Sequence, residues 1–524
     1  MYRKKAGSFL LLAMLMVVTM TISGCLDSGE AGVSNESDVK ELILGEMWDI
    51  ESIDPAEDIK VICEKALVVE TLVTTNEDFS LASGLATSWQ QLDNNTWEFK
   101  LRNDVKFHDG TDMTAEDVKF SLERAISRNV KVASMLNVES IEVKDNHTLL
   151  ITTADLNPIL PGVLHYPCTA IINSNSVDEN GGLIKPIGTG PYMFDSFDEQ
   201  TNVLTVVKNK DWWGGESGLE RIVIKGMPDP NTRAIAIESG EVDFTVDVPY
   251  SETDRIDALE GINVEKYVVP RVYKIDVNLA KDGLNDTRVR QAVSYAIDRD
   301  SIVEHVLYNV GEPAAGPFLP DMIWANKDLE PYKQDYEKAD SLLTEAGWVD
   351  TDGDGIRDKD GQKLELNLMT FSTRPGLPPM AEAIAAQLGE IGIEVTPEVL
   401  EYGAILERQK EGNWDLSLAP FTIAMVPDPE FVLTNWYSTN GTDNKPGYSN
   451  PEVDKLIEET RGITDQEERY AKFNEVEKIV YEEQPMILVA YYGCAIVKKD
   501  EVKGYVFDPT AHDYRINAGM YIEK

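Results

Sequence analysis

The chain has 524 residues and is strongly acidic, with 48 Lys and Arg against 92 Asp and Glu and a formal net charge of −44. An acidic surface repels phosphate backbones, which excludes nucleic acid as a partner. The length exceeds what one hydrophobic core supports and predicts two or three lobes. Besides Cys25 the cysteines are Cys63, Cys168 and Cys494, too few for a disulfide-stapled scaffold, so we expect buried free thiols.

The first 25 residues have the pattern of an export signal. Arg3 to Lys5 are positive, Phe9 to Met20 is almost wholly apolar, and small residues precede Cys25. The apolar run is shorter than the roughly 20 residues that a membrane-spanning helix prefers. We therefore predict a lipoprotein signal peptide over residues 1–24, with a lipid attached to Cys25 at the outer face of a cell membrane, on the periplasmic or extracellular side. An ordinary cleaved signal and an uncleaved anchor are the alternatives.

Residues 25–40 are polar and rich in Asp, Glu, Ser and Gly. A segment of this composition buries too little apolar surface to fold, so it predicts a flexible tether. No later stretch is long and apolar enough to cross a bilayer, which predicts a soluble body attached to the membrane through its lipid alone.

Helical and strand patterns then alternate along the chain. Residues 97–101 alternate as a strand, and Thr114 begins a capping-box pattern in front of a helix. The spacing of apolar residues predicts one continuous helix from Asp286 to His305. Residues 364–368 alternate as a strand, 383–391 follow a helical period, and 393–395 return to a strand pattern. Pro451, after Asn450, opens a further helix. This interleaving predicts α/β lobes.

No sequence pattern points to catalysis. The five histidines are scattered without metalloprotease spacing, and neither a G-x-S-x-G elbow nor a P-loop is present. Acidic pairs are common only because acids are common, so they do not indicate a glycosidase. We predict a protein that is not an enzyme and requires no cofactor.

One loop has the spacing of a calcium site. Asp350, Asp352, Asp354 and Asp358 occupy positions one, three, five and nine of an EF-hand loop, but Gly361 stands at position twelve, where that loop has a bidentate glutamate. A structural Ca²⁺ ion and an empty solvated turn are therefore both open.

Longer motifs carry a family resemblance. The motifs, in chain order, are Leu85–Trp89, Val105–Thr111, Pro186–Tyr192, Asn209–Gly215, Glu238–Asp243, Asp286–Ala292 and Leu342–Trp348. Together they resemble the extracytoplasmic solute-binding proteins of family 5, the peptide and nickel binders of ABC importers. The resemblance covers roughly residues 41 to 520.

The resemblance implies a two-lobed, periplasmic-binding-protein-like α/β clamshell of the large class II type. It implies a discontinuous lobe I over residues 41–78, 185–268 and 494–524, an accessory domain of that lobe over 79–184, and lobe II over 269–493. Ligand would bind in the cleft between the lobes and be read by a permease, with ATP hydrolysis left to a partner subunit.

The resemblance also suggests ligand-binding residues. Peptide binders of the family hold the ligand's amino terminus with an aspartate at the position where this chain has Met425. The amine anchor is therefore missing there, although Arg374 could neutralise a ligand carboxylate; a surface arginine is the alternative.

The nickel-binding branch is resembled as well. Trp48 matches a tryptophan near that branch's cleft, one arginine position corresponds to Tyr166, and the other falls near Lys131 or Val132. His165, Tyr166 and Cys168 offer a borderline-soft metal neighbourhood, which Cys63 could also face. A loop histidine beside core thiols is the alternative.

We therefore expect a lipid-anchored, monomeric binding protein that captures nickel, a nickel chelate, or a di- or oligopeptide for an ABC permease and its ATPase. Nickel ranks slightly ahead of peptide. A surface sensor or chaperone-like protein using the same clamshell is the alternative.

Overall fold

The structure is a computed structural model that describes residues 40–57, 61–463, 465–511 and 513–523. Apart from these gaps, residues 40–524 form one compact unit. The predicted signal peptide, Cys25 and all of the predicted tether except Lys40 lie outside the described residues. Among the residues described, no helix has both the length and the apolar character needed to span a bilayer.

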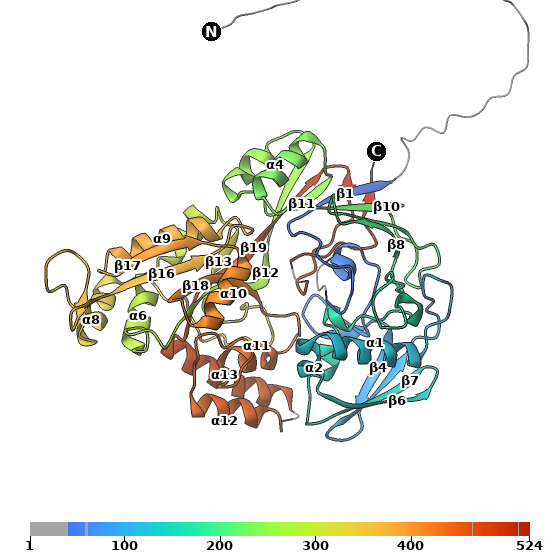
Figure 1. The fold of residues 1–524 in the computed structure, drawn as a ribbon, viewed down its shortest axis with the longest axis horizontal. Helices are drawn as coiled ribbons and strands as arrows, with labels where there is room; N and C mark the ends of the chain where they lie inside the picture. The colour runs from blue at the N-terminus through green and yellow to red at the C-terminus, as the bar shows by residue number, and fades with distance from the viewer. Residues whose placement is uncertain (1–39, 58–60, 464, 512, 524) are drawn as a thin grey trace, which may run out of the picture. The chain divides into compact units, whose positions relative to one another are not determined.

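A mixed sheet runs through the unit that begins at Lys40 (Figure 1). Its strands lie in the order β17-β16-β18-β12-β19-β11-β1-β10-β9-β8, and β13 pairs with β19. The strands of this sheet are β1 (Glu41–Glu46), β8 (Tyr192–Asp198), β9 (Val203–Lys208), β10 (Arg221–Gly226), β11 (Phe244–Val246), β12 (Ile262–Val277), β13 (Gly311–Pro313), β16 (Glu365–Thr370), β17 (Glu394–Val399), β18 (Leu416–Thr422) and β19 (Met486–Lys499).

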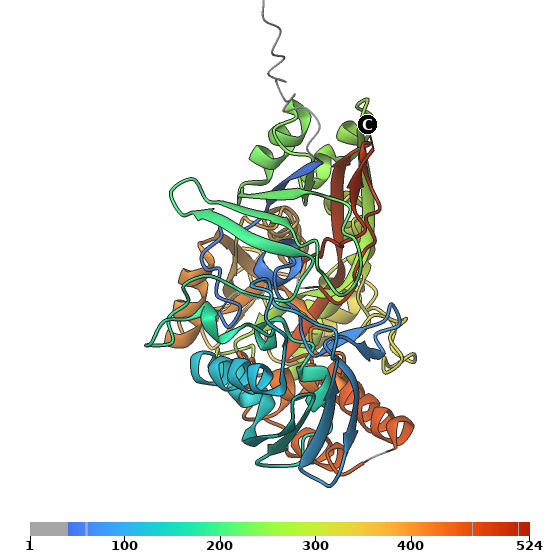
Figure 2. The same cartoon turned by 90° about the vertical axis from the view of Figure 1, so that its right-hand side faces the viewer.

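The two long strands β12 and β19 pair antiparallel and join the two halves of this sheet (Figure 2). Beyond them β19 pairs with β11 on one side, and β12 pairs with β18 on the other. The register between β12 and β19 shifts between Val268 and Val272. The predicted lobe boundaries, 268/269 and 493/494, fall at this irregularity and remain a prediction.

A smaller four-stranded sheet, in the order β4-β5-β7-β6, lies within residues 86–153. Helix α1 packs against β6 and β7 of this sheet, and the predicted capping box at Thr114 is confirmed at its start. The elements of this part are β2 (Val73–Thr75), β3 (Leu81–Ser83), β4 (Ala86–Gln91), β5 (Thr96–Leu101), α1 (Ala115–Arg128), α2 (Val130–Leu136), β6 (Val138–Asp145), β7 (Thr148–Thr153) and α3 (Leu160–Val163).

Helices dominate the rest of the chain, together with two short strand pairs. The helices are α4 (Pro230–Ser239), α5 (Thr253–Asp257), α6 (Thr287–Ala296), α7 (Arg299–Ser301), α8 (Tyr336–Glu345), α9 (Leu377–Gly389), α10 (Tyr402–Glu411), α11 (Pro429–Tyr437), α12 (Pro451–Thr460) and α13 (Gln466–Glu483). The short strands are β14 (Asp358–Lys359), β15 (Gln362–Lys363), β20 (Val502–Lys503) and β21 (Tyr521–Ile522).

The prediction of one helix from Asp286 to His305 is wrong. Helix α6 ends at Ala296 because Ile297 is extended, with φ −80° and ψ 116°. The Asp298 carboxylate then accepts a hydrogen bond from the Ser301 amide at 3.0 Å and caps a new helical turn. The apolar period continues across the break, which is why the sequence pattern did not show it.

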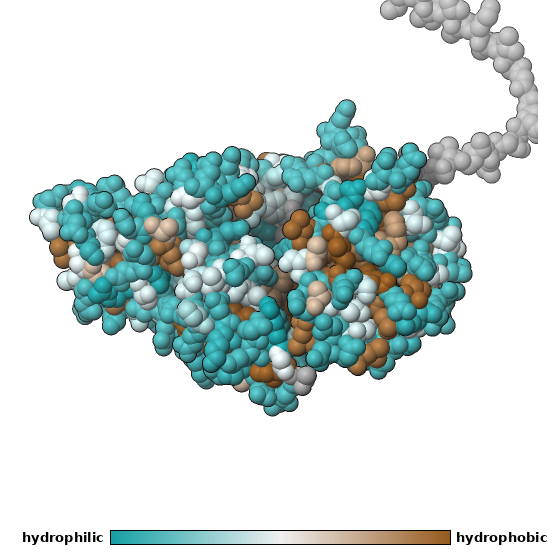
Figure 3. Space-filling view, turned by 60° about the horizontal axis from the view of Figure 1, so that its bottom comes forward, coloured by the Kyte–Doolittle hydropathy of each residue, from teal (hydrophilic) through white to brown (hydrophobic). Residues whose placement is uncertain are grey.

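Other sequence expectations are confirmed. The expected strands at 97–101, 364–368 and 393–395 correspond to β5, β16 and β17, and the helix expected after Asn450 is α12. The expected burial of Cys63, Cys168 and Cys494 is confirmed. Figure 3 shows a mostly hydrophilic surface, in keeping with the net charge of −44, with hydrophobic side chains gathered toward the right of the view.

Candidate ligand cavity

A cavity of about 310 Å³, called here the ligand cavity, is lined by residues from widely separated parts of the chain. Seven of its fifteen lining residues are aromatic. The lining residues are Trp48, Lys131, Tyr166, Arg271, Phe371, Arg374, Tyr402, Pro420, Phe421, Thr422, Met425, Phe431, Asn435, Trp436 and Asp443.

The sheet topology explains why these residues meet. Trp48 follows the carboxyl end of β1, and Phe371 follows that of β16. Phe421 is the second-to-last residue of β18. Strand β1 is parallel to β10 and β11, and β16 is parallel to β17 and β18. Crevices beyond the carboxyl ends of parallel strands are where α/β proteins bind ligands.

Four of the six predicted ligand-binding residues line the ligand cavity: Trp48, Tyr166, Arg374 and Met425. The structure places the other two elsewhere. His165 is 2% exposed, and its Nδ1 lies 3.4 Å from the Val73 carbonyl oxygen. Cys63 lines a separate cavity of about 340 Å³.

One end of the ligand cavity is a buried ionic network centred on Asp513. Its carboxylate accepts hydrogen bonds from Arg271 Nη1 at 2.5 Å, from Trp48 Nε1 at 2.9 Å, and from Arg374 Nη2. Arg271, Arg374 and Asp513 are 2%, 3% and 4% exposed. Charges this deeply buried are stable only when paired, and here the protein supplies the pairing itself.

Arg374 is held by further contacts within the same network. Its Nη1 donates to the Tyr492 hydroxyl at 3.1 Å, and its guanidinium lies 5.3 Å from the centre of the Trp48 ring. Asp247 lies 3.8 Å away and accepts a hydrogen bond from Tyr492. Burial raises the pKa of the Asp247 carboxyl, although the Arg374 charge opposes that shift.

Lys131 and Asp443 also line the ligand cavity. Among the residues that the structure describes, neither side chain makes a hydrogen bond or an ion pair. Lys131 Nζ lies 5.4 Å from the Phe431 ring centre and 5.9 Å from that of Tyr166. Lys131 is exposed and Asp443 is half-buried, so both keep access to whatever enters the cavity.

A buried pair supports two of the aromatic walls. Lys274 Nζ lies 3.9 Å from the Phe421 ring centre and 4.9 Å from that of Trp436, and its other contact is the Asp276 carboxylate. Both charged side chains are almost wholly buried. Burial lowers the pKa of Lys274 and raises that of Asp276. The two rings are therefore fixed from behind by a cation–π contact.

The family model for bacterial extracellular solute-binding proteins, family 5, matches residues 80–444, which is more than half of the chain. The chain belongs to this family. Family 5 consists of solute-binding proteins rather than enzymes.

Curated relatives match almost end to end. The oligopeptide-binding protein AppA of Bacillus subtilis is 27% identical, covering 98% of each chain. The nickel-binding protein NikA of Staphylococcus aureus is also 27% identical, covering 95% of this chain and 96% of that protein.

Solved structures agree with the fold. The Staphylococcus aureus NikA complex with Ni(L-His)₂ superposes with a TM-score of 0.81 at 26% identity, over 92% of this chain and all of that one. The Bacillus subtilis AppA complex with a nonapeptide has a TM-score of 0.79 at 25% identity, over 93% of this chain and all of that one. The two-lobed α/β clamshell expected from the sequence is confirmed.

The metal donors predicted for this family 5 protein do not converge on the ligand cavity. Burial raises the pKa of the Tyr166 phenol and lowers that of His165 to about 4, so the phenol stays protonated and the imidazole neutral. Cys168 is 1% exposed. Within the described ranges, the side chains that come close enough to hold a metal ion as a group of three or more are Asp350, Asp352 and Asp354.

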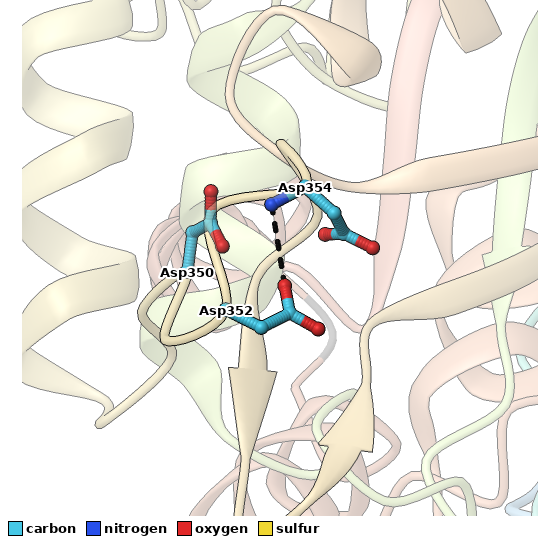
Figure 4. Close-up of side chains that lie close together, drawn as sticks. All are labelled: Asp350, Asp352 and Asp354. Carbon is cyan, nitrogen blue, oxygen red and sulfur yellow. Dashed lines mark hydrogen bonds between the residues drawn. The ribbon is translucent and has the colours of Figure 1, made fainter.

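These three aspartates lie on one exposed turn (Figure 4), with their nearest donor atoms within 4.8 Å of one another. The Asp354 amide donates to the Asp352 carboxylate at 3.2 Å, and Lys363 pairs with Asp354. Asp358 lies outside this group, and its carboxylate accepts from the Thr351 amide at 2.9 Å. A structural calcium ion on this turn remains a prediction.

The sequence did not single out Arg271 and Asp443, which line the ligand cavity, or Asp513, which pairs with its arginines. Arg271 lies within a long strand, and Asp443 and Asp513 lie in loops without a local motif. The contact between Arg271 and Asp513 joins positions 242 residues apart. A single sequence contains no signal for such a pairing.

Proposed function

We propose that this protein binds a small zwitterionic ligand in the ligand cavity, either a dipeptide or a nickel complex of amino-acid size, and delivers it to an ABC permease. The observation that carries the proposal is that Lys131 and Asp443, which make no ion pair among the described residues, line a small aromatic cavity. No observation favours the sensor or chaperone-like alternative.

The cavity volume supports a small ligand. About 310 Å³ lies at the lower end of the roughly 300–1,000 Å³ that small-molecule sites occupy. The AppA relative was solved with a nonapeptide, a ligand much larger than a cavity at that lower limit holds.

The charges support a zwitterion. The Asp443 carboxylate could pair with a ligand ammonium group and so replace the amine anchor that is missing at Met425. The Lys131 ammonium could pair with a ligand carboxylate. Arg271 and Arg374 are less suited to the carboxylate role because Asp513 already pairs with both, and Asp247 lies 3.8 Å from Arg374. Charge-assisted contacts in a desolvated cavity are the strong ones.

Nickel would enter together with its organic ligand. The predicted protein donors do not gather at the cavity, so a chelate would supply most of its own metal ligands. The NikA relative was solved with Ni(L-His)₂, which is a complex of this kind.

Closure would follow the expected lobe boundaries, with lobe I at 41–78, 185–268 and 494–524, its accessory domain at 79–184, and lobe II at 269–493. A ligand that contacts both lobes stabilises the closed form by its difference in affinity for the two forms. Lys131 and Asp443 belong to different sides of this division, so a ligand bridging them would favour closure.

The predicted lipid on Cys25 would hold the protein beside its permease at the outer face of the membrane. A tether of about 15 residues has a root-mean-square reach of about 20 Å. A Cys25→Ser protein should bind ligand normally and fail to support uptake. Normal uptake by a fully released Cys25→Ser protein would contradict the anchor.

Native mass spectrometry of the purified protein, before and after metal chelation, tests the ligand. A retained mass of a dipeptide, or a chelator-sensitive mass of nickel with an organic ligand, supports the proposal. A retained long peptide, or a ligand of another class, contradicts it. A lone calcium ion would support only the Asp350 turn.

A further inference from the structure

A second and larger cavity of about 600 Å³ lies next to the ligand cavity. Its lining includes Trp89, Trp97, Gly162, Trp324, Pro427 and Tyr470. Both cavities are bounded by the same two segments of the chain, residues 161–166 and residues 425–428.

Different residues of the segment 425–428 line the two cavities. Met425 lines the ligand cavity, Pro427 and Asp428 line the larger one, and Val426 between them is fully buried. The segment 161–166 also contributes to both cavities. Gly162 lines the larger cavity, and Tyr166 lines the ligand cavity.

The two segments are packed against each other at Gly162. A methyl group built on Gly162 would lie 3.6 Å from both Val426 Cγ1 and Pro427 Cδ, which is van der Waals contact. Met425 and Val426 belong to the hydrophobic cluster formed by the first part of the chain, together with Leu160 and Val163. The contact between the two segments is therefore apolar.

The segment is anchored on its other side. Asp428 caps α11 by accepting from the Glu430 amide at 2.9 Å, and Arg469 donates to both Asp428 oxygens at 2.6 and 2.8 Å. Arg469 also donates to Glu430 at 2.6 Å. Pro427 and Pro429 restrict the backbone on either side of Asp428.

We propose that residues 425–428, packed on Gly162, form a wall that limits the length of the ligand by closing the larger cavity to it. The inference rests on the proposed function and adds to it a reason for the small size of the ligand. Removing the side chains of Val426 and Pro427 would join the two cavities and admit longer ligands.

Calorimetric titration with two length series tests the wall. One series is alanine-rich peptides of two to nine residues, and the other is the nickel complexes of histidine and of a histidine-containing nonapeptide. For wild-type protein we expect the dissociation constant to rise at least about tenfold between the shortest and the longest member of whichever series binds.

In the Val426→Ala/Pro427→Ala variant we expect this length penalty to fall to about threefold or less, with the short ligand bound nearly as in wild type. Val432→Ala is the matched control, because Val432 is 1% exposed in the neighbouring α11 but lines neither cavity; its length penalty should be that of wild type. If circular dichroism shows the double variant to be unfolded, Pro427→Ala takes its place.

Wild-type protein that binds long and short members equally overturns the wall and leaves the proposed function intact. So does a folded wall variant that keeps the full length penalty. Absence of binding by every member of both series contradicts the proposed function, and with it the reason for the wall.

Discussion

The two ends of the ligand cavity carry the same kinds of charge in opposite circumstances. At one end Arg271 and Arg374 are buried and both pair with Asp513. At the other end Lys131 and Asp443 reach solvent, and among the described residues they make no ion pair. The first arrangement stabilises the fold, whereas the second leaves charge available to a ligand.

The physical reason is desolvation. A buried charge that loses its partner is costly, so the paired end cannot give up Asp513 to a ligand without replacing it. A partly exposed charge is hydrated, so the lack of a protein partner costs it little free energy. It gains a partner when a ligand displaces that water. Being charged and lining a cavity is therefore a weak guide to ligand binding unless the existing partners are counted.

The largest expected effect is at the paired end. Asp513→Asn leaves two buried guanidiniums without their shared carboxylate, and we expect the free energy of unfolding to fall by about 3–5 kcal/mol. Urea unfolding measures it. Asp282→Asn, at an exposed position, should change it by less than about 0.5 kcal/mol. A loss of under about 1 kcal/mol for Asp513→Asn would mean that the network does not stabilise the fold.

Acid should weaken the fold through two histidines outside the cavity. Burial lowers the pKa of His108 and of His165 from 6.5 to about 4. His108 Nε2 lies 3.0 Å from the Gly190 carbonyl oxygen, and its Nδ1 accepts from the Gly188 amide at 3.2 Å, so its neutral form satisfies both nitrogens.

Between pH 6.5 and 4 the unfolded chain binds more protons than the folded one, so stability that is present at neutral pH is lost as the pH falls. From pH 7 to pH 5 each histidine should cost about 2 kcal/mol, measured by urea unfolding at both pH values. His108→Gln should remove about half of this pH dependence. An unchanged pH profile would show that His108 is protonated in the folded protein.

The unpaired end should affect binding and not folding. Asp443→Asn removes the proposed partner of the ligand ammonium, and we expect affinity to fall by about tenfold to a hundredfold, from the 1.5–3 kcal/mol of a charged hydrogen bond. Calorimetry on the ligand found by native mass spectrometry measures it. Stability should stay within about 0.5 kcal/mol of wild type, and Asp282→Asn should bind normally. Wild-type affinity in Asp443→Asn would remove the amine anchor from the proposal.

The smallest effect is expected at Lys131, which is the more exposed of the two charges. Lys131→Met keeps most of the apolar stem and removes the charge, so affinity should fall about fivefold, or about 1 kcal/mol. Lys131→Arg should restore most of it, because both residues offer a cation to a carboxylate. Equal losses in the two variants would indicate a packing role for the side chain instead.

Sequence reasoning succeeded where the information was local or spread over long motifs. The capping box at Thr114 needs four consecutive residues, and the family resemblance needs only the order of motifs such as Pro186–Tyr192. Residues matched through that resemblance, including Trp48 and Met425, do line the cavity.

It failed where a partner far along the chain decides the role. The sequence placed Arg374 at the cavity. It contained no sign that Arg374 pairs with Asp513, which lies 139 residues away. His165 stands next to Tyr166 in sequence and yet faces the Val73 carbonyl rather than the cavity, because the chain turns between the two residues. The break at Ile297 was hidden because apolar spacing continues through it.

The pairing of β12 with β19 also bears on when the protein can fold. Residues 262–277 meet residues 486–499 along almost their whole length, so the strand that joins the two halves of the sheet is made only when nearly all of the chain exists. The four-stranded sheet within residues 86–153 has short-range pairings and can form early. Contacts between distant segments form slowly. The binding cavity, which needs both halves, should therefore be the last part of the molecule to mature, and a chain truncated before Met486 should contain an ordered early sheet and no ligand site.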